Sequence, residues 1–336
     1  MTLIRVPVSR LQDLVAGYLT NNNISGPNAA AVARALVQAE VDGQKGHGLT
    51  RIDSYTAQAR VGKVDGHAEP KLNRTRPGAL MIDVSHGFCY RALEIATAEL
   101  PKLAAENGIA AAGLVRSHHA GALGQATERL ARAGMLAMMF TNAPQAMTSW
   151  GGRKPVFGTN PIAFAAPRRN ADPIIVDLAL SEVARGKILA AAQKGEDIPE
   201  GWAKDAEGRP TTDAKAALKG TVFPAGGAKG AALALMVEVL SASLVGANHS
   251  FEASSLFDAE GPPPALGQFM IAIDPGAFAG ADAFADRLEL LASAIEGDEG
   301  ARLPGARRAE LRAAADRNGV EVSSELVTQL EGGANL

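Results

Sequence analysis

A histidine held between two glycines, with an arginine four residues later, has the plainest chemistry in this 336-residue sequence. In the segment Gly46-His47-Gly48-Leu49-Thr50-Arg51, the glycines let backbone and ligand approach closely. A histidine has an ordinary pKa of ~6.5, so His47 can give a proton to a carbonyl oxygen as hydride arrives and take it back in reverse. Arg51 can hold a carboxylate beside that donor with paired hydrogen bonds. The alternative is a capped helix end with a surface histidine and a solvated arginine.

Three further clusters of glycine and polar residues fit contacts to phosphate or carboxylate groups. Residues 116–122, Arg-Ser-His-His-Ala-Gly-Ala, lie between a predicted strand and a predicted helix, where free backbone amides suit an anion. Gly158-Thr159-Asn160-Pro161 precedes a strand that ends at Asp177, a position where ligand contacts are common. Lys229 lies among glycines at the start of a long predicted helix, which fits a phosphate contact. The plain alternatives are a turn, a helix N-cap and a glycine loop that allows helix packing.

Composition and missing motifs narrow the function classes. The net charge is −3 and only 4% of residues are aromatic, so nucleic acid and anionic membranes are poor candidate partners. The single cysteine, Cys89, excludes an internal disulfide, and the adjacent histidines His118 and His119 point in different directions, so no metal site is expected. We find no signal peptide and no membrane span, and therefore expect a cytoplasmic protein. The Gly-x-Gly-x-x-Gly signature of dinucleotide-binding folds is also absent.

The elements that must position these clusters alternate between strands and helices, which indicates a mixed α/β fold. Strands are predicted at 79–84, 110–115, 135–140, 162–166, 174–178 and 269–273, and helices at 90–107 and 123–133. Ser9 and Gln12 fit a capping box at the first helix. A long helix is expected from residues 226–230 to near Gly246, and residues 191–221 are polar and turn-rich, which indicates a surface excursion.

Taken together, the clusters resemble the malate/L-lactate dehydrogenase family of the second type, which is unrelated to the Rossmann-fold enzymes of the same names. The resemblance extends from Asn28 to Arg308. Six pieces carry it, in order: His47-Gly48-Leu49-x-Arg51, Ser117-x-His119-x-Gly121, Gly158-Thr159-Asn160-Pro161 with Ala163, Ala184-x-Gly186-Lys187-Ile188, Gly226-Gly227-x-Lys229-Gly230 and Leu303-Pro304-Gly305.

The resemblance implies a non-Rossmann fold with a largely antiparallel cofactor-binding sheet, flanked by helices from both chain ends. We accordingly expect a helical region at 1–75 that carries the histidine loop and packs with 300–336, a mixed core at 76–225, and a long helix with a closing strand at 226–299. The resemblance further implies a homodimer with its active site near the subunit interface, and NAD or NADP as cofactor. For the reaction, the resemblance implies His47 as proton donor and, in some members, His119 as a catalytic base. It implies Arg51 and Thr159 as substrate contacts. The implied cofactor contacts are His118, His119, Ala120, Gly121, Ala122, Asp177, Leu178, Ala179, Lys229, Pro304 and Gly305.

Three departures from the family pattern bear on the substrate. Gly46 stands where many members have a serine next to the proton donor, Lys187 stands where imino-acid reductases tend to have aspartate, and Ala120 replaces a common phenylalanine.

The leading hypothesis is an NAD(P)-dependent enzyme that interconverts a small 2-oxo acid and 2-hydroxy acid. The alternatives are a reductase of a cyclic imino acid and, from another class, a non-catalytic dimeric binding protein. The choice between NADH and NADPH stays open.

Overall fold

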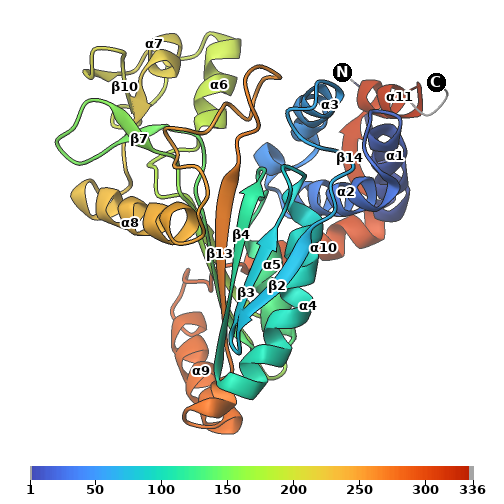
Figure 1. Ribbon diagram of the computed structural model, residues 1–336, viewed down its shortest axis with the longest axis vertical. Coiled ribbons are helices and arrows are strands. Elements are labelled where there is room, and N and C mark those ends of the chain that lie inside the picture. Colours follow the sequence, from blue (N-terminus) through green and yellow to red (C-terminus); the bar gives the residue numbers. More distant parts are fainter. Residues whose placement is uncertain (1, 333–336) are drawn as a thin grey trace.

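A seven-stranded sheet runs through the centre of the computed structural model, which describes residues 2–332 (Figure 1). Within this sheet, neighbouring strands pair antiparallel except β3 with β4, which pair parallel. The mixed α/β class is therefore confirmed. In spatial order the strands are β2 (Lys71–Arg76), β3 (Ala79–Asp83), β4 (Ile109–Ser117), β13 (Leu266–Ile273), β5 (Leu136–Thr141), β8 (Ile162–Ala166) and β9 (Ile174–Leu178).

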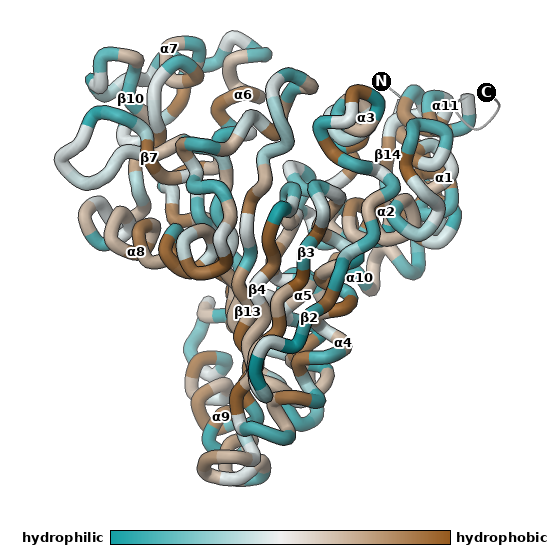
Figure 2. The backbone as a smooth tube through the Cα atoms, viewed as in Figure 1, coloured by the Kyte–Doolittle hydropathy of each residue, from teal (hydrophilic) through white to brown (hydrophobic). Residues whose placement is uncertain are grey.

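Helices α4 (Cys89–Asn107) and α5 (Gly124–Arg132) cover one face of this sheet. Their apolar sides pack on the central strands, and Figure 2 shows hydrophobic residues along those strands while the edge strand β2 is mostly hydrophilic. Every residue of β2 is exposed, and its lysine and arginines discourage pairing with another chain. Helix α9 (Ala281–Glu296) follows the short turn η4 (Pro275–Ala277). Arg168, just after β8, forms ion pairs with Glu289 and Glu296 of this helix and so holds it near the end of that strand.

The two chain ends lie side by side and build a helical layer beside the sheet (Figure 1). Strand β1 (Leu3–Val6) pairs antiparallel with β14 (Val320–Ser323), although more than 300 residues separate them in the sequence. One apolar core joins residues of both ends, including Leu11, Leu36 and Leu330. The helices of this layer are α1 (Val8–Thr20), α2 (Gly26–Val41), α3 (Ile52–Arg60), α10 (Ala306–Asn318) and α11 (Ser324–Gly332).

Residues 191–221 lie mostly at the surface, as predicted, but they are more ordered than a loop. The segment contributes a short helix and three short strands to a second sheet of five strands, in the order β11-β10-β12-β6-β7, whose other two strands come from residues 147–157. Its small apolar residues, such as Ala203 and Ala217, are buried against Leu180 and Ile188, and single alanines in a polar run give no periodic signal. The elements are β6 (Met147–Thr148), β7 (Pro155–Phe157), α6 (Arg185–Lys194), β10 (Ala203–Lys204), β11 (Pro210–Thr211), α7 (Ala214–Lys219) and β12 (Thr221–Val222).

Two helix details also differ from the prediction. Helix α1 begins at Val8 after Pro7 and has no side-chain cap, so Ser9 lies inside the helix and forms no capping box. The long helix is α8 (Ala228–Glu238) followed by a π-helical turn, η3 (Val239–Ser243), where the Ser241 hydroxyl donates to the Val237 carbonyl at 2.6 Å. No helix within residues 2–332 is long and apolar enough to cross a membrane. The three residue ranges expected as domains stay a proposal, and β2 spans the expected boundary at residue 75.

Candidate active site

The loop that carries His47 consists of two tight turns, η1 (Lys45–His47) and η2 (Leu49–Arg51), ahead of α3. A Cβ atom on Gly48 would lie 2.4 Å from Glu40 Oε2 and 3.2 Å from the Glu40 backbone, so only glycine fits there. The same carboxylate accepts a hydrogen bond from the Leu49 amide at 3.2 Å and so holds the second turn. A Cβ atom on Gly46 would meet nothing within 4 Å. Gly48 is therefore required by packing, whereas Gly46 is not.

His47 and His119, the two predicted catalytic histidines, are stacked on each other. Their ring centroids are 5.2 Å apart and their planes differ by 18°. His47 comes from the turn before α3, whereas His119 follows the end of β4. The sheet therefore brings together two side chains that are distant in the sequence. Within the stack the rings make no hydrogen bond to each other; His119 is bonded to Tyr55, whereas His47 Nδ1 is buried without a partner among the described residues.

His119 is held by a tyrosine from α3. The Tyr55 hydroxyl lies 2.7 Å from His119 Nδ1 and 2.9 Å from the Tyr90 hydroxyl. Tyr55 is fully buried, and Tyr90 is 5% exposed. Sequence reasoning missed both tyrosines, although Tyr55 follows Arg51 by one helical turn, a spacing that places two side chains on the same helix face.

His118 points away from its neighbour into the protein interior. It is 1% exposed, and its Nε2 lies 2.8 Å from Gln58 Oε1. Because the Gln58 amide nitrogen donates to the Leu256 carbonyl at 3.1 Å, the Gln58 oxygen must accept, and His118 carries its proton on Nε2. His118 thus connects β4 to α3 and to the loop at residue 256. This partner set favours a structural role over the direct cofactor contact predicted from the sequence.

Arg51 keeps most of its hydrogen-bonding capacity for a ligand. Its Nε donates to the Gly46 carbonyl at 2.7 Å, and the guanidinium carbon lies 4.9 Å from the centre of the Phe257 ring. Among the described residues, its two terminal nitrogens have no hydrogen-bond partner. These two contacts fix the plane of the guanidinium while leaving its two-pronged edge available to a carboxylate.

Asp177, at the end of β9, is a junction between three parts of the chain. Its Oδ2 accepts hydrogen bonds from Gln44 Nε2 at 3.0 Å and from the Gly124 amide at 3.0 Å, and it pairs with Arg308 at 3.3 Å. A Cβ atom on Gly124 would lie 2.4 Å from the Arg308 guanidinium, so any side chain at this position would displace Arg308 from its place beside Asp177. Three buried polar atoms around this junction have no hydrogen-bond partner within residues 2–332: Gln44 Oε1, His47 Nδ1 and Arg308 Nη1.

The environment keeps the site histidines neutral. Burial is the main cause that lowers the pKa of His47 to about 4; the Arg51 cation adds to it and the Asp177 carboxylate opposes it. Burial and the same arginine lower the pKa of His118 to about 3 and the pKa of His119 well below its ordinary value. A carboxylate bound to Arg51 would cancel part of the cationic effect and raise the pKa of His47.

These three histidines predict that the protein loses stability in acid. Their rings bind protons below ~6.5 in the unfolded chain, but only near or below about pH 4 in the folded chain. Stability is therefore fully present above that window and falls as pH drops through it, by up to about 1.4 kcal/mol per pH unit for each ring. Urea unfolding at a series of pH values measures this slope. His118→Gln should reduce the slope by about one proton, and exposed His67→Gln is the control. A free energy of unfolding that stays constant across the window would contradict the prediction.

The remaining predicted site residues lie at varied distances from the histidine pair. Ala120 and Ala122 are buried and line a small cavity with Tyr90. Gly121 has φ +67°, and a Cβ atom on it would lie 2.8 Å from the Tyr90 hydroxyl. Thr159 is tied to Leu180, whose amide donates to its carbonyl at 2.8 Å. Lys229 is exposed at the start of α8, and no interaction links it to the histidine pair among the described residues.

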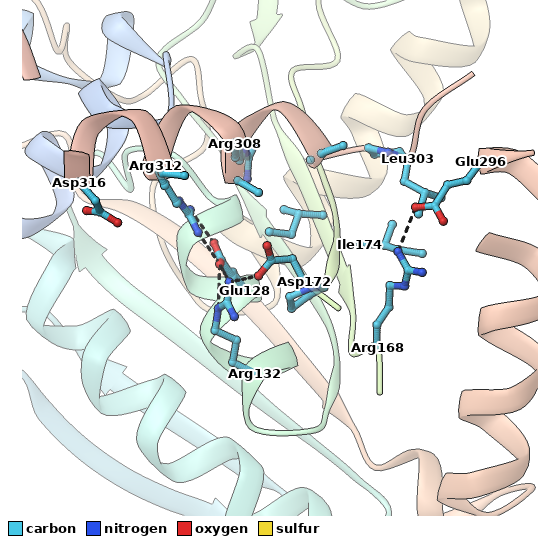
Figure 3. A pocket seen from close by; sticks show the side chains of 17 residues that line it. Glu128, Arg132, Arg168, Asp172, Ile174, Glu296, Leu303, Arg308, Arg312 and Asp316 are labelled. Carbon is cyan, nitrogen blue, oxygen red and sulfur yellow. Dashed lines mark hydrogen bonds and ion pairs between the residues drawn. The ribbon is translucent and has the colours of Figure 1, made fainter. Parts of the chain in front are cut away.

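Pro304 and Gly305 pack on β9, next to a cavity of about 440 Å³ between β9, α5 and α10 (Figure 3). The Pro304 carbonyl accepts from the Ile175 amide at 3.2 Å. The arginines around this cavity are already paired: Arg312 with Glu128, Arg132 with Asp172, and Arg168 with Glu296 (Figure 3). Leu178, which directly follows Asp177 on β9, is 47% exposed, and Ala179 comes next. The Pro304-Gly305 turn therefore contacts the same strand that carries Asp177, and Arg308, on the helix after the turn, pairs with Asp177.

Within residues 2–332, no group of three histidine, cysteine, aspartate or glutamate side chains could hold a metal ion. The site is instead built from two neutral imidazoles, a free guanidinium edge and a buried carboxylate with unpaired polar atoms around it. Such a set can move a proton and bind an anion. This arrangement is expected of an oxidoreductase in which a bound cofactor supplies the redox chemistry and the protein supplies the proton.

Known proteins with similar sequences and structures place the chain in a family. A sequence model of malate/L-lactate dehydrogenase matches residues 6–331. The (2R)-3-sulfolactate dehydrogenase (NADP(+)) of Chromohalobacter salexigens is 50% identical over 284 residues, 84% of each chain. A Delta(1)-pyrroline-2-carboxylate/Delta(1)-piperideine-2-carboxylate reductase of Pseudomonas putida is 39% identical over 329 residues, 96% of this chain and 95% of that protein. The crystal structure of delta1-piperideine-2-carboxylate reductase from Pseudomonas syringae pv. tomato superposes with a TM-score of 0.93 at 35% identity, over 98% of this chain and 99% of that one.

The chain therefore belongs to the malate/L-lactate dehydrogenase family, and the resemblance seen in the sequence is confirmed. It is an oxidoreductase, because its relatives are dehydrogenases and reductases across nearly its whole length. The hypothesis of a non-catalytic binding protein is set aside.

Proposed function

We propose that this protein uses NADH or NADPH to reduce a small 2-oxo acid to the 2-hydroxy acid, and catalyses the reverse reaction. The observation that carries the proposal is the stacked pair of His47 and His119 beside the free edge of Arg51. A 2-oxo acid needs one group to bind its carboxylate and another to protonate its carbonyl oxygen. Arg51 suits the first task and the histidine pair suits the second.

The surroundings of Asp177 fit a nicotinamide dinucleotide. Gln44 Oε1 and Arg308 Nη1 are buried without partners in the part of the chain that the structure describes, and a ligand with amide and hydroxyl groups would satisfy both. Asp177 Oδ2 already accepts from Gln44, Gly124 and Arg308, so we expect cofactor contacts here through the other carboxylate oxygen, Oδ1, and through the backbone of residues 177–179. The backbone of residues 118–122, the Pro304-Gly305 turn and Lys229 complete the proposed contacts. When bound, the reduced nicotinamide supplies the hydride.

Around this ligand the chain's own residues hold and move the proton. Arg51 grips the substrate carboxylate, and Thr159 is the proposed second substrate contact. His47 gives its proton to the carbonyl oxygen, and the bound carboxylate offsets the cationic effect that keeps this ring neutral in the free protein. The fully buried ring of Tyr55 backs the histidine pair and helps to exclude water from it.

A cyclic imino acid is the second candidate substrate. It carries a carboxylate next to a C=N bond, so the same arginine and histidines would serve. The likeness to the Pseudomonas reductases favours it, whereas the relative with the highest identity quoted above acts on sulfolactate. Lys187, which stands where imino-acid reductases tend to have aspartate, is exposed on the first turn of α6.

The test of the proposal is an absorbance assay at the nicotinamide band. NADH and NADPH are each offered with pyruvate, oxaloacetate, 3-sulfopyruvate and the two cyclic imines, Δ1-pyrroline-2-carboxylate and Δ1-piperideine-2-carboxylate. The proposal predicts turnover with at least one oxo acid at a kcat/KM well above that for either imine. Faster turnover of an imine would support the second candidate, and no turnover with any of them would exclude both.

We also propose a homodimer in the cytoplasm. The α8–η3 segment exposes a row of apolar side chains, and such a face on a soluble chain is usually covered by a partner. One free, buried cysteine fits a reducing compartment. The exposed apolar residues are Leu233, Leu235, Met236 and Val239 within this segment and Leu244 directly after it.

A charge placed on this face should separate the subunits. Leu235 is 53% exposed in one chain, and a glutamate there would be buried without a partner in the dimer, at a cost of several kcal/mol. Sedimentation should show a dimer for the wild-type protein and a monomer of about 34.6 kDa for Leu235→Glu. Leu72→Glu, on the exposed strand β2, should remain dimeric. An active wild-type monomer would overturn the homodimer proposal.

A further inference from the structure

Two of the three tyrosines in the chain lie buried together beneath the histidine pair. Tyr55 comes from α3 and Tyr90 from the first turn of α4, and their hydroxyls are 2.9 Å apart. A buried phenol costs free energy unless its hydroxyl is hydrogen-bonded, so phenylalanine would fill the same space at lower cost. The third tyrosine, Tyr18, is remote from the site, where its hydroxyl accepts from Gln329 at 3.3 Å.

The direction of the hydrogen bonds between these groups follows from a count of donors. If Tyr90 donates to Tyr55 and Tyr55 donates to His119 Nδ1, each hydroxyl proton has an acceptor. In the opposite direction the Tyr90 proton would have no acceptor among the described residues. Leaving a buried donor unpaired costs more than leaving an acceptor free. The first direction is therefore the stable one, and it leaves the proton of the neutral His119 ring on Nε2.

Solvent does not reverse this preference. The cavity beside Tyr90 measures about 10 Å³ and is lined mainly by apolar groups, including Leu93, Ala122 and Ala126. That volume is at the lower limit for one water molecule, which would also need several polar partners. Gly121 contributes to the confinement, because a Cβ atom on it would lie 2.8 Å from the Tyr90 hydroxyl.

We propose that Tyr90 and Tyr55 are positioning residues that lock His119 as a neutral Nε2–H donor toward the reacting oxygen. Nδ1 is taken by Tyr55, so Nε2 is the ring nitrogen left for a ligand. The two stacked histidines then have different tasks: His47 gives its proton to the oxygen, and His119 keeps its proton and stabilises the developing negative charge by a hydrogen bond. This inference rests on the proposed function. A neutral His119 ring keeps its proton on Nε2 throughout the reaction, so it can stabilise the developing charge on the oxygen while His47 loses and regains its own proton.

Ring nitrogen NMR on the full-length protein tests the lock without any substrate. The chain has six histidines, so a spectrum of protein labelled with ¹⁵N-histidine is sparse, and a His119→Gln sample assigns the His119 signals. The wild-type ring should show a protonated Nε2 and a bare Nδ1 at neutral pH. Tyr55→Phe should give a mixture of both tautomers, whereas Tyr18→Phe should leave the spectrum unchanged.

The double variant Tyr55→Phe/Tyr90→Phe guards against a simple folding defect, because removing both hydroxyls leaves no buried donor unpaired. It should fold and bind reduced cofactor like the wild type, show mixed His119 tautomers, and reduce the oxo acid at least about tenfold more slowly. Wild-type tautomer and turnover in this variant would overturn the inference. If the wild type itself reduces no oxo acid or imine, the proposed function fails, while the NMR result still decides whether the tyrosines set the tautomer.

Discussion

Replacing His47 by glutamine should lower the kcat for 2-oxo acid reduction by about 10²–10⁴-fold, the usual scale for loss of a proton donor. Cofactor affinity should stay close to that of the wild type, because the proposed cofactor contacts lie on β9, residues 118–122 and the Pro304-Gly305 turn. Single-turnover kinetics and a fluorescence titration with NADPH measure the two effects separately. Glutamine keeps the size and polarity of the side chain, so the change isolates the titratable proton.

The pH profile provides the control for this assignment. In the free enzyme His47 is protonated only below about pH 4, so kcat/KM for reduction should fall as pH rises above that value. In the pH profile of kcat the same limb should lie at higher pH, because the bound substrate carboxylate offsets the charge of Arg51 and so raises the pKa of His47. The limb should vanish in His47→Gln. His119→Gln should retain the limb, and it should both weaken cofactor binding and slow the chemical step, because the proposed Nε2–H donor is lost. If the limb survives in His47→Gln and disappears in His119→Gln, the two roles must be exchanged.

Replacing Arg51 by lysine should raise KM for the oxo acid strongly. The guanidinium edge is held in one plane by Gly46 and Phe257, and an ammonium group cannot reproduce its paired hydrogen bonds. Loss of one charged hydrogen bond costs about 1.5–3 kcal/mol, which corresponds to roughly a 10–150-fold increase in KM. Steady-state kinetics with saturating cofactor measures it.

Arg60→Lys is the matched control, since Arg60 is exposed at the end of the same helix, α3. It should leave KM unchanged. An unchanged KM in Arg51→Lys would show that this side chain does not hold the substrate carboxylate, and the search for that contact would move to other cationic groups near the histidines.

The main strands and helices could be predicted because they carry strong local signals. The runs at 162–166 and 174–178 coincide with β8 and β9, and the helix predicted at 90–107 is α4 with one more residue. The five-stranded sheet could not be found, because strands of two or three residues such as β6 and β10 are too short for an alternating pattern. The edge strand β2 is polar throughout, so nothing in its composition separates it from a loop.

For the site, the glycine-flanked histidine and the arginine after it were accessible from the sequence, since their spacing alone suggests one loop that presents both groups. The stacking of His47 on His119 depends on how β4 meets the first helices, which is a tertiary arrangement. The contact between Arg308 and Asp177 joins residues more than 100 positions apart. Tyr55 could have been found from its helical spacing to Arg51, but its partner Tyr90 lies on another helix.

The most direct test of the account is the transfer of deuterium from cofactor to product. The enzyme is incubated with the 2-oxo acid that it turns over fastest and with reduced cofactor that carries deuterium at C4 of the nicotinamide, prepared separately in each of the two C4 configurations. Mass spectrometry of the 2-hydroxy acid then shows whether the label has arrived at C2. The account predicts one deuterium per product molecule from one of the two labelled cofactors and none from the other. Product without deuterium from either, or oxidation of the cofactor without formation of the hydroxy acid, would contradict it.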